Sequence, residues 1–257
     1  MILCLDVGNT NITMGAFYGD ALMQVFRITT KLPRTSDEYG VLLREMVQMT
    51  GTSYLDVKGI IIASVVPNIM YSLTSGCIKY FHVTPIVVGP GTKTGIQMKA
   101  VNPREVGPDL IVNAAAVKEL YGGPAIVIDY GTATTYQLVL EDGTLDSVVI
   151  TPGILTSATA LSSDAARITE VEIKRPKTIL ARETTECIQA GLYWGTLGET
   201  EYIVRKMKEE SGLANIKVVA TGGFGKLLAD ETDIIDLYDA NLTLHGLRII
   251  YNKCKTR

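Results

Sequence analysis

Apolar and polar residues alternate through much of the first thirty residues of the chain. Residues 2–5 form a continuous apolar run, whereas residues 11–17 and 22–29 alternate between apolar and polar. Alternation is typical of strands that bury one face, so the three segments predict an antiparallel meander. The later run at residues 59–65 is apolar and β-branched, and it predicts a buried parallel strand.

Helical spacing of apolar residues follows these strands. The cluster at residues 35–38, Thr-Ser-Asp-Glu, is typical of a helix start, and apolar residues continue it with helical spacing. We expect a second helix over residues 68–80, a short strand over 85–88 and a loop over 89–95. Residues 109–121 predict a further helix with an apolar face formed by Ile111, Val112, Ala115, Ala116 and Leu120.

The second half of the chain repeats this order of elements. Strands are expected at residues 125–128, 134–140, 145–150 and 216–220, and helices at 185–211 and 242–251. Repetition of strands, glycine turn, strands and helices predicts an α/β protein with two domains of similar plan, residues 1–118 and 119–257. Ligands would then bind at the carboxyl ends of strands and between the two lobes.

Composition restricts the class of protein. The chain has 257 residues, is 47% hydrophobic and 20% charged, and carries a net charge of −3, which is typical of a soluble globular protein. The charge balance gives no indication of nucleic-acid or membrane-surface binding. Its four cysteines include no C-x-x-C pair, so neither a zinc site nor a redox motif is expected. Without a signal peptide at the N-terminus, a cytoplasmic location is expected.

Two turns carry the candidate chemistry. The first apolar strand leads into Asp6-Val7-Gly8-Asn9-Thr10, and the later one leads into Asp129-Tyr130-Gly131-Thr132-Ala133-Thr134-Thr135. An acid at the end of a strand suits Mg²⁺, and a glycine lets the backbone approach a phosphate. Alone, the first turn is better explained as a plain hairpin, and the threonines of the second are only moderate evidence because threonine is common in strands. The repetition indicates two halves that face a shared anionic ligand.

Two further segments have polar residues beside glycine. Thr221-Gly222-Gly223 follows an apolar strand, where its amide groups could face a nucleotide. In Gly107-Pro108-Asp109-Leu110, the acid could cap the following helix or act as a general base toward a substrate hydroxyl. The sequence contains neither a P-loop motif nor a G-x-G-x-x-G motif.

As a set, these segments resemble the type III pantothenate kinases, a family of the acetate and sugar kinase/Hsp70/actin superfamily. The matching segments lie in the family's order along nearly the whole chain: Asp6 to Thr10, Arg34-Thr35-Ser36-Asp37-Glu38-Tyr39, Asn102 to Gly107 with Asp109, Asp129 to Thr135, Pro152-Gly153, Thr221-Gly222-Gly223, and residues 242–247. The resemblance implies two ribonuclease-H-like domains with mixed sheets, as in the actin and Hsp70 ATPases, and a central cleft.

The resemblance also implies an activity, which is ATP-dependent phosphorylation of pantothenate to 4'-phosphopantothenate in the first step of coenzyme A biosynthesis. Mg²⁺, a monovalent cation (K⁺ or NH₄⁺) and a homodimer are expected with it. Two alternatives stay open. One is a kinase of the same superfamily that acts on another small hydroxyl compound, and the other is a catalytically silent regulator similar to the Bvg accessory factors.

By family pattern, each site residue has an expected role. Asp109 would be the proton acceptor, Asp6 would serve Mg²⁺, and Asp129 would bind the monovalent cation. The nucleotide site would comprise Asp6, Val7, Gly8, Asn9, Thr10, Asn11, Ile12, Thr13 and Thr132. The substrate contacts would be Ala100, Gly107, Pro108, Asp109, Leu110 and Thr184.

The chain departs from the family's pattern on the substrate side. Leu110 stands where the family usually has arginine, Ala100 where it usually has an aromatic residue, and Ser147-Val148 where it has two glycines. Loss of an arginine removes five hydrogen-bond donors and a positive charge. These departures weaken the expectation of pantothenate as substrate more than the expectation of ATP binding.

Overall fold

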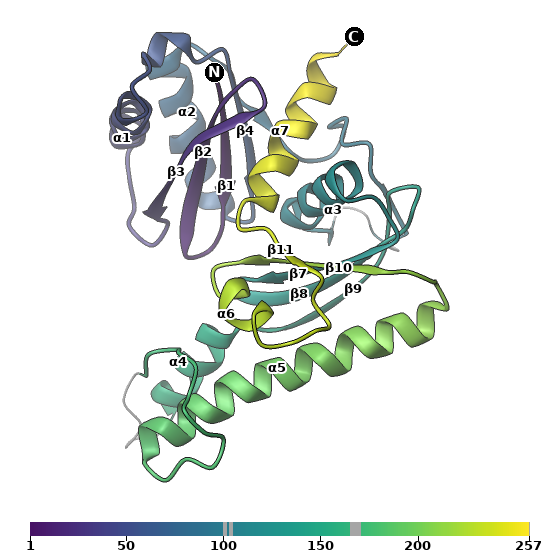
Figure 1. Cartoon of the computed structure of the whole chain (residues 1–257). Coiled ribbons are helices and arrows are strands. Elements are labelled where there is room, and N and C mark those ends of the chain that lie inside the picture. The colour runs from purple at the N-terminus through teal and green to yellow at the C-terminus, as the bar shows by residue number, and fades with distance from the viewer. Residues whose placement is uncertain (100–101, 103–104, 165–170, 257) are drawn as a thin grey trace. The chain divides into compact units, whose positions relative to one another are not determined.

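The computed structural model of the chain describes residues 1–99, 102, 105–164 and 171–256. Within these residues the chain folds into two compact units, each with its own sheet and core (Figure 1). Unit 1 comprises residues 1–96, 102, 105–119 and 242–256. Unit 2 comprises residues 97–99 and 120–241.

Unit 1 has a mixed five-stranded sheet in the order β3-β2-β1-β4-β5. Its strands are β1 (Ile2–Val7), β2 (Asn11–Tyr18), β3 (Ala21–Thr29), β4 (Gly59–Ser64) and β5 (Ile86–Val87). Its helices are α1 (Ser36–Met49), α2 (Met70–Phe81), α3 (Pro108–Leu120) and α7 (Leu242–Lys255), with short 3₁₀ turns η1 (Tyr54–Asp56) and η2 (Pro67–Ile69).

Helices cover both faces of this sheet because alternate strand residues point to opposite sides. Leu3 and Leu5 of β1 contribute to a core with residues of α1 and α2. Cys4, between them, contributes to a second core with α3 and α7. Burial raises the pKa of the Cys4 thiol well above its ordinary value, as expected for a core cysteine.

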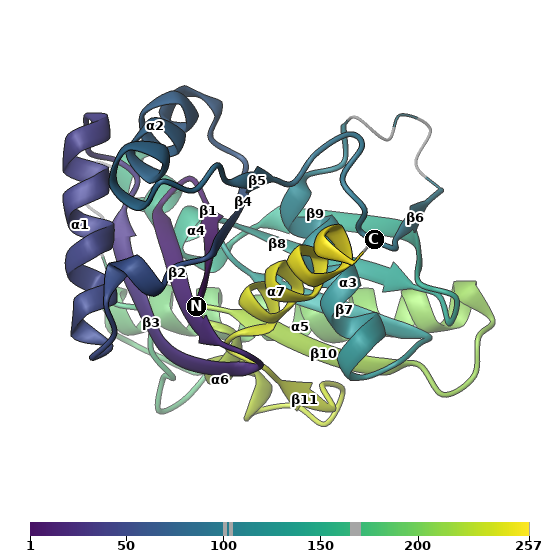
Figure 2. The same cartoon turned by 90° about the horizontal axis from the view of Figure 1, so that it is seen from above.

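Unit 2 has a mixed six-stranded sheet in the order β11-β10-β7-β8-β9-β6. Its strands are β6 (Gln97–Met98), β7 (Ala125–Tyr130), β8 (Ala133–Val139), β9 (Thr144–Pro152), β10 (Lys217–Gly222) and β11 (Leu237–Tyr238). Its helices are α4 (Ile154–Asp164), α5 (Thr184–Ser211) and α6 (Gly225–Ala229). Figure 2 shows the strands and helices of both units from above. Ile126 and Ile128 of β7 pack with Tyr193 and Val204 of α5 in the core.

The expected strands and helices are largely confirmed, including the β1–β2–β3 meander, the parallel β1–β4 pair and the long helix α5. Helix α1 begins at the expected cluster because Thr35 and Glu38 form a capping box. Two expectations for helix α3 were wrong, namely its single apolar face and the burial of Leu120. Helix α3 is buried at every position from Leu110 to Val117 rather than along one face, and Leu120 is 41% exposed.

The units differ from the expected domain limits in two respects, although the chain changes unit after Glu119, next to the expected boundary at residue 118. Residues 97–99, which include β6, belong to unit 2 rather than to the first domain. Residues 242–256, which include α7, belong to unit 1 rather than to the second domain. The reason is packing, since Leu247 and Ile250 of α7 share a buried core with Cys4 and Ile61. Among the described residues, no helix is both long enough and apolar enough to cross a bilayer.

Candidate active site

The two acidic turns have equivalent positions in their own sheets. Asp6 lies near the end of β1, where it is paired across the β1–β2 hairpin with Thr13. Asp129 lies near the end of β7, where it is paired across the β7–β8 hairpin with Thr135. In both units the acid-bearing strand also has a parallel neighbour on its other side, β4 in unit 1 and β10 in unit 2. The repeat expected from the sequence is therefore a repeat of strand topology.

The glycines of these turns use their own amides to close the turns. The Gly8 N–H donates to the Asn11 carbonyl at 3.0 Å, and the Gly131 N–H donates to the Ala133 carbonyl at 3.2 Å. These two amides are therefore used within their own turns. A Cβ placed on Gly8 would meet only the Asn11 carbonyl oxygen, at 3.4 Å, an ordinary contact distance. The chain itself thus leaves open space beside Gly8.

The side chains of the predicted nucleotide segment divide into two groups. Val7 and Ile12 are buried in the core of unit 1, so only their backbone can contact a ligand. Asn9 and Asn11 are exposed, and Asp6, Thr10 and Thr13 are half-buried. Thr30 stabilises the turn from β3, because its hydroxyl donates to the Gly8 carbonyl at 2.8 Å and its N–H donates to the Thr10 carbonyl at 3.0 Å.

Asp109 lies in the first turn of α3 and its carboxylate folds back over the preceding glycine. A Cβ on Gly107 would lie 2.3 Å from the Asp109 Oδ1 atom, so this conformation requires glycine at position 107. Burial is the largest influence on the carboxyl group and raises its pKa, while N–H groups of Leu110 and of Asp109 itself oppose the shift. A carboxylate with a raised pKa in a polar helix start suits a general base.

Contacts between α3 and α7 orient the start of α3 within unit 1. The Thr243 hydroxyl donates to the Asn113 side-chain oxygen at 2.8 Å, and Lys253 forms an ion pair with Glu119 at 3.1 Å. These contacts hold α3 and α7 together within unit 1. Tyr251, near the end of α7, lies against Gly59 at the beginning of β4. The start of α3, which carries Asp109, is held within unit 1 by packing of Val112 and Ala115 against α7 and the sheet.

The other predicted substrate residues have different surroundings. Leu110 is buried, with 8% of its surface exposed, so its side chain belongs to the interior of α3 rather than to an open surface. Gly107 and Pro108 are half-buried, and Thr184 is exposed at the start of α5. Ala100 lies outside the described residues. The meeting of Gly8 with Gly131, which lie in different units, stays a prediction.

Glycine and threonine residues surround Asp129 in unit 2. Gly222 has φ +90°, and a Cβ there would lie 2.7 Å from the Asp129 Oδ1 atom and 2.6 Å from the Tyr130 backbone N and O atoms. Thr221 is paired with Asp129 across the parallel β10–β7 pair. The Thr132 carbonyl accepts hydrogen bonds from the Gly153 N–H at 3.0 Å and the Thr156 hydroxyl at 2.6 Å. Pro152-Gly153 therefore contacts the turn directly.

A buried hydroxyl network, which the sequence did not indicate, fixes the residue next to Asp129. The Thr200 hydroxyl on α5 lies 3.0 Å from the Tyr130 hydroxyl and 3.1 Å from the Tyr136 hydroxyl. Burial raises the pKa of Tyr136 to about 12, so it is un-ionised at neutral pH and can donate. The Thr200 hydroxyl thus links α5 to the strands that carry the Asp129 turn.

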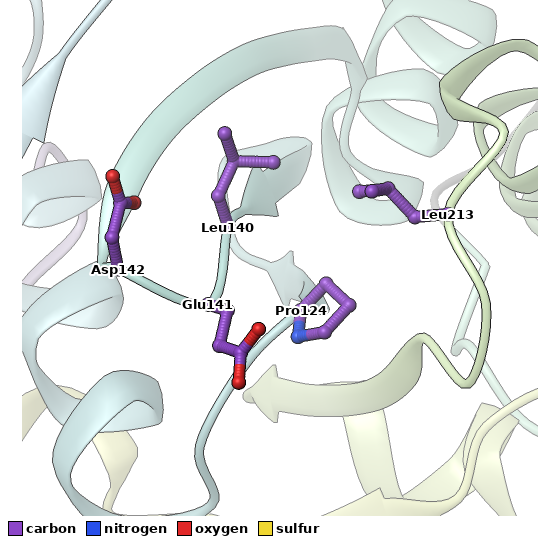
Figure 3. A pocket seen from close by; sticks show the side chains of 5 residues that line it. All are labelled: Pro124, Leu140, Glu141, Asp142 and Leu213. Atoms are coloured by element: carbon purple, nitrogen blue, oxygen red, sulfur yellow. The ribbon is translucent and has the colours of Figure 1, made fainter.

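A surface hollow of about 440 Å³ lies elsewhere in unit 2 (Figure 3). It is lined by Pro124, Leu140, Glu141, Asp142 and Leu213. Pro124 precedes β7, whereas Asp129 lies near the other end of that strand. None of the predicted site residues lines this hollow, and we do not assign it to the active site.

Sequence comparisons identify related proteins. The sequence profile of the type III pantothenate kinases matches residues 2–206. A type III pantothenate kinase from Agathobacter rectalis is 53% identical over 253 residues, which cover 98% of this chain and 97% of that protein. One from Bacillus cytotoxicus is 48% identical over 253 residues, which cover 98% and 96%.

Solved structures share the fold at low sequence identity. A protein described as a Baf family transcriptional activator from Campylobacter jejuni has a TM-score of 0.60 at 18% identity, with 98% of both chains covered. A protein described as a 2-dehydro-3-deoxygalactonokinase from Sinorhizobium meliloti has a TM-score of 0.59 at 13% identity, with 100% and 98% covered. The two ribonuclease-H-like units agree with this fold, and the sequence matches are decisive for the family. The chain belongs to the type III pantothenate kinase family.

Proposed function

We propose that this protein transfers the γ-phosphate of ATP to the primary hydroxyl of pantothenate, which gives 4'-phosphopantothenate, in the cytoplasm. Family membership supports the overall reaction. The carboxylate of Asp109 is the observation that carries the mechanism, because it is held at the start of α3 and burial raises its pKa. Such a group can accept the hydroxyl proton as the new O–P bond forms.

The rest of the chemistry is positioning and charge neutralisation, which dominate phosphoryl transfer. We assign the nucleotide to Asp6–Thr13 and Thr132, where turn residues are exposed and the chain leaves space beside Gly8. In the described part of the chain, no three His, Cys, Asp or Glu side chains gather into a metal site. This fits Mg²⁺ held by one carboxylate together with phosphates and waters.

Each acid of the repeated turns is assigned to one cation. Asp6 would hold Mg²⁺ and Asp129 would hold K⁺ or NH₄⁺, and the bound cations supply positive charge to the triphosphate. Backbone carbonyls suit a monovalent cation, and Asp129 precedes the turn whose carbonyls at Gly131 and Thr132 lie close to Gly153. On the acceptor side we assign Ala100, Gly107, Pro108, Leu110 and Thr184. Because the Leu110 side chain is buried, its contribution would come from its backbone.

ADP release in the presence of MgATP and a potassium salt tests this proposal. We expect ADP formation to require pantothenate and to fall when sodium replaces potassium. If ADP forms only with another small hydroxyl compound, that compound and not pantothenate is the substrate. ATP binding without turnover on any acceptor would instead favour a silent regulatory relative and contradict the kinase mechanism.

We further propose a homodimer in which a second copy contacts α5. Gly191, Gly195 and Gly198 lie along one exposed face of this helix, and a Cβ on any of them would meet no atom within 4 Å. Tyr202, which continues the same face, is 62% exposed. An exposed glycine costs a helix about 1 kcal/mol relative to alanine, so three of them on one face are unfavourable for an isolated helix. Close approach of another helix would explain them.

Substitution of Gly195 with leucine is expected to convert the dimer to a monomer. The larger side chain would prevent close approach at the middle of the face, yet it has room in the isolated chain. Sedimentation velocity measures the oligomeric state, and Ser211→Leu at the far end of α5 is the control. If the Gly195→Leu protein remained a dimer, this face of α5 would be excluded as the dimer interface.

A further inference from the structure

The segment from Arg34 to Tyr39 belongs to the family resemblance, but none of the roles described above uses it. The residues after Arg34 are explained by helix formation, since Thr35 and Glu38 form the N-terminal capping box of α1. Arg34 precedes the cap and takes no part in it. It is half-buried.

The Arg34 side chain is held in place from two sides. Its Nη1 group donates to the Thr29 carbonyl at 2.7 Å. Its guanidinium carbon lies 6.0 Å from the centre of the Tyr39 ring, and that ring is fully buried. The capping box fixes the backbone on its C-terminal side. An arginine anchored in this way loses little further entropy when it binds a ligand.

The anchor point lies beside the first acidic turn. Thr29 is paired with Asn11, the first residue after that turn. The next residue, Thr30, holds both the Gly8 and the Thr10 carbonyls. Arg34 is therefore attached to the strand end that fixes the turn, and all of these residues belong to unit 1.

The charge of Arg34 is not neutralised by an ion pair within the described residues. The nearest acid in sequence is Glu38, whose carboxylate accepts from the Thr35 N–H at 2.7 Å and from the Thr35 hydroxyl at 2.9 Å. These two bonds are the main reason that the pKa of Glu38 is lowered, and the charge of Arg34 adds a smaller effect. The guanidinium keeps donor groups that Thr29 does not use.

The proposed nucleotide segment needs such a charge. Residues 6–13 include one acid and no lysine or arginine. A triphosphate carries several negative charges, and Mg²⁺ offsets only part of them. Planar guanidinium groups bind phosphate oxygens with paired hydrogen bonds.

We propose that Arg34 is a further nucleotide-binding residue, which donates hydrogen bonds to a phosphate group of the ligand at the Gly8 turn. This proposal rests on the proposed ATP site. The neighbouring Lys31 is the alternative cation of the same segment, but it is exposed and its ammonium group has no partner among the described residues. The geometry favours Arg34 because its position is fixed before the ligand binds.

Binding and kinetics of Arg34→Gln test the proposal. We expect the Kd for ATP and the KM for ATP to rise about 10- to 100-fold, which is the usual effect of losing a charge-assisted hydrogen bond. The KM for pantothenate and the affinity for adenosine, which has no phosphate, should stay within about twofold. Arg34→Lys should recover part of the loss, because it restores charge without the planar donor pair.

Matched controls distinguish binding from folding. Arg44→Gln removes another half-buried arginine of unit 1, which stacks on Tyr54 at 3.7 Å, and it should leave nucleotide affinity unchanged. The assignment would be overturned if Arg34→Gln weakened ATP and adenosine binding equally, changed only the KM for pantothenate, or left the Kd for ATP unchanged. It would also be overturned if Lys31→Gln raised the Kd for ATP more than Arg34→Gln does. Failure of the unsubstituted protein to bind ATP would instead refute the proposed function itself.

Discussion

Replacing Asp109 with asparagine is expected to lower kcat about 100- to 10,000-fold, the usual contribution of a general base, while ATP binding is retained. The amide can still accept the backbone hydrogen bonds at the start of α3, but it cannot take a proton. Initial-rate kinetics give kcat, and equilibrium dialysis gives the Kd for ATP. A variant that kept full turnover would show that another group accepts the proton.

The raised pKa of Asp109 gives this prediction a pH signature. The base must be ionised, so kcat/KM should fall as pH falls through the folded-state pKa, which lies above the reference value of 3.8. The small residual rate of Asp109→Asn should lack this acid limb. If both proteins had the same pH–rate profile, the fall in rate at low pH would come from a group other than Asp109.

Stability supplies the control for this substitution. Because the folded-state pKa is raised, the contribution of Asp109 to stability is present at low pH and is lost as pH rises through that pKa. Ionised Asp109 is therefore unfavourable to folding at neutral pH, and Asp109→Asn should not unfold more readily there. Urea unfolding at pH 7 checks this, and a marked loss of stability would indicate that the carboxylate has a structural role.

Replacing Gly222 with alanine is expected to destabilise the protein by about 2–5 kcal/mol and to impair nucleotide turnover. The positive φ of Gly222 is unfavourable for a residue with a side chain, at about 1–2 kcal/mol. The added Cβ would also overlap the Tyr130 backbone and the Asp129 carboxylate, and overpacking of this kind costs about 1–3 kcal/mol. Both the turn and the carboxylate would have to move.

Gly212 provides a matched control for the backbone effect. It ends α5 with φ +62°, but a Cβ there would meet nothing within 4 Å. Gly212→Ala should therefore show only the conformational cost, about 1–2 kcal/mol, and normal kinetics. Urea unfolding and the KM for ATP measure both variants. Equal stability and equal kinetics of the two alanine variants would mean that the crowding at Gly222 has no consequence.

The elements that the sequence predicted well depend on local interactions. Alternation along β2 and β3 sets which face each residue presents, and the capping box at Thr35 requires only residues within one turn of helix. The short strands β6 and β11 were missed because two residues show no periodicity and polar residues interrupt or flank them, whereas the equally short β5 lies within the apolar run at residues 85–88. Helix α4, between Pro152-Gly153 and α5, was not resolved as a separate helix within the expected helical region.

The candidate site was predictable as a set of segments but not as an arrangement. The two strand-acid-glycine segments indicated a repeated turn, and both acids are paired with a threonine across their hairpins. The sequence did not show that the Gly8 amide closes its own turn or that Gly107 makes room for the Asp109 carboxylate. Both depend on close contacts between atoms, which residue types alone do not determine.

By itself, the sequence determined the kinds of elements, their order and the family of this protein, because periodicity, caps and motif order are properties of the chain. The tertiary structure decided that α7 completes the first unit, that α3 is buried around its circumference, and that Arg34 is anchored beside the Gly8 turn. Each of these depends on contacts between residues far apart in sequence. Which apolar face meets which sheet is chosen by shape and burial, and no local pattern records that choice.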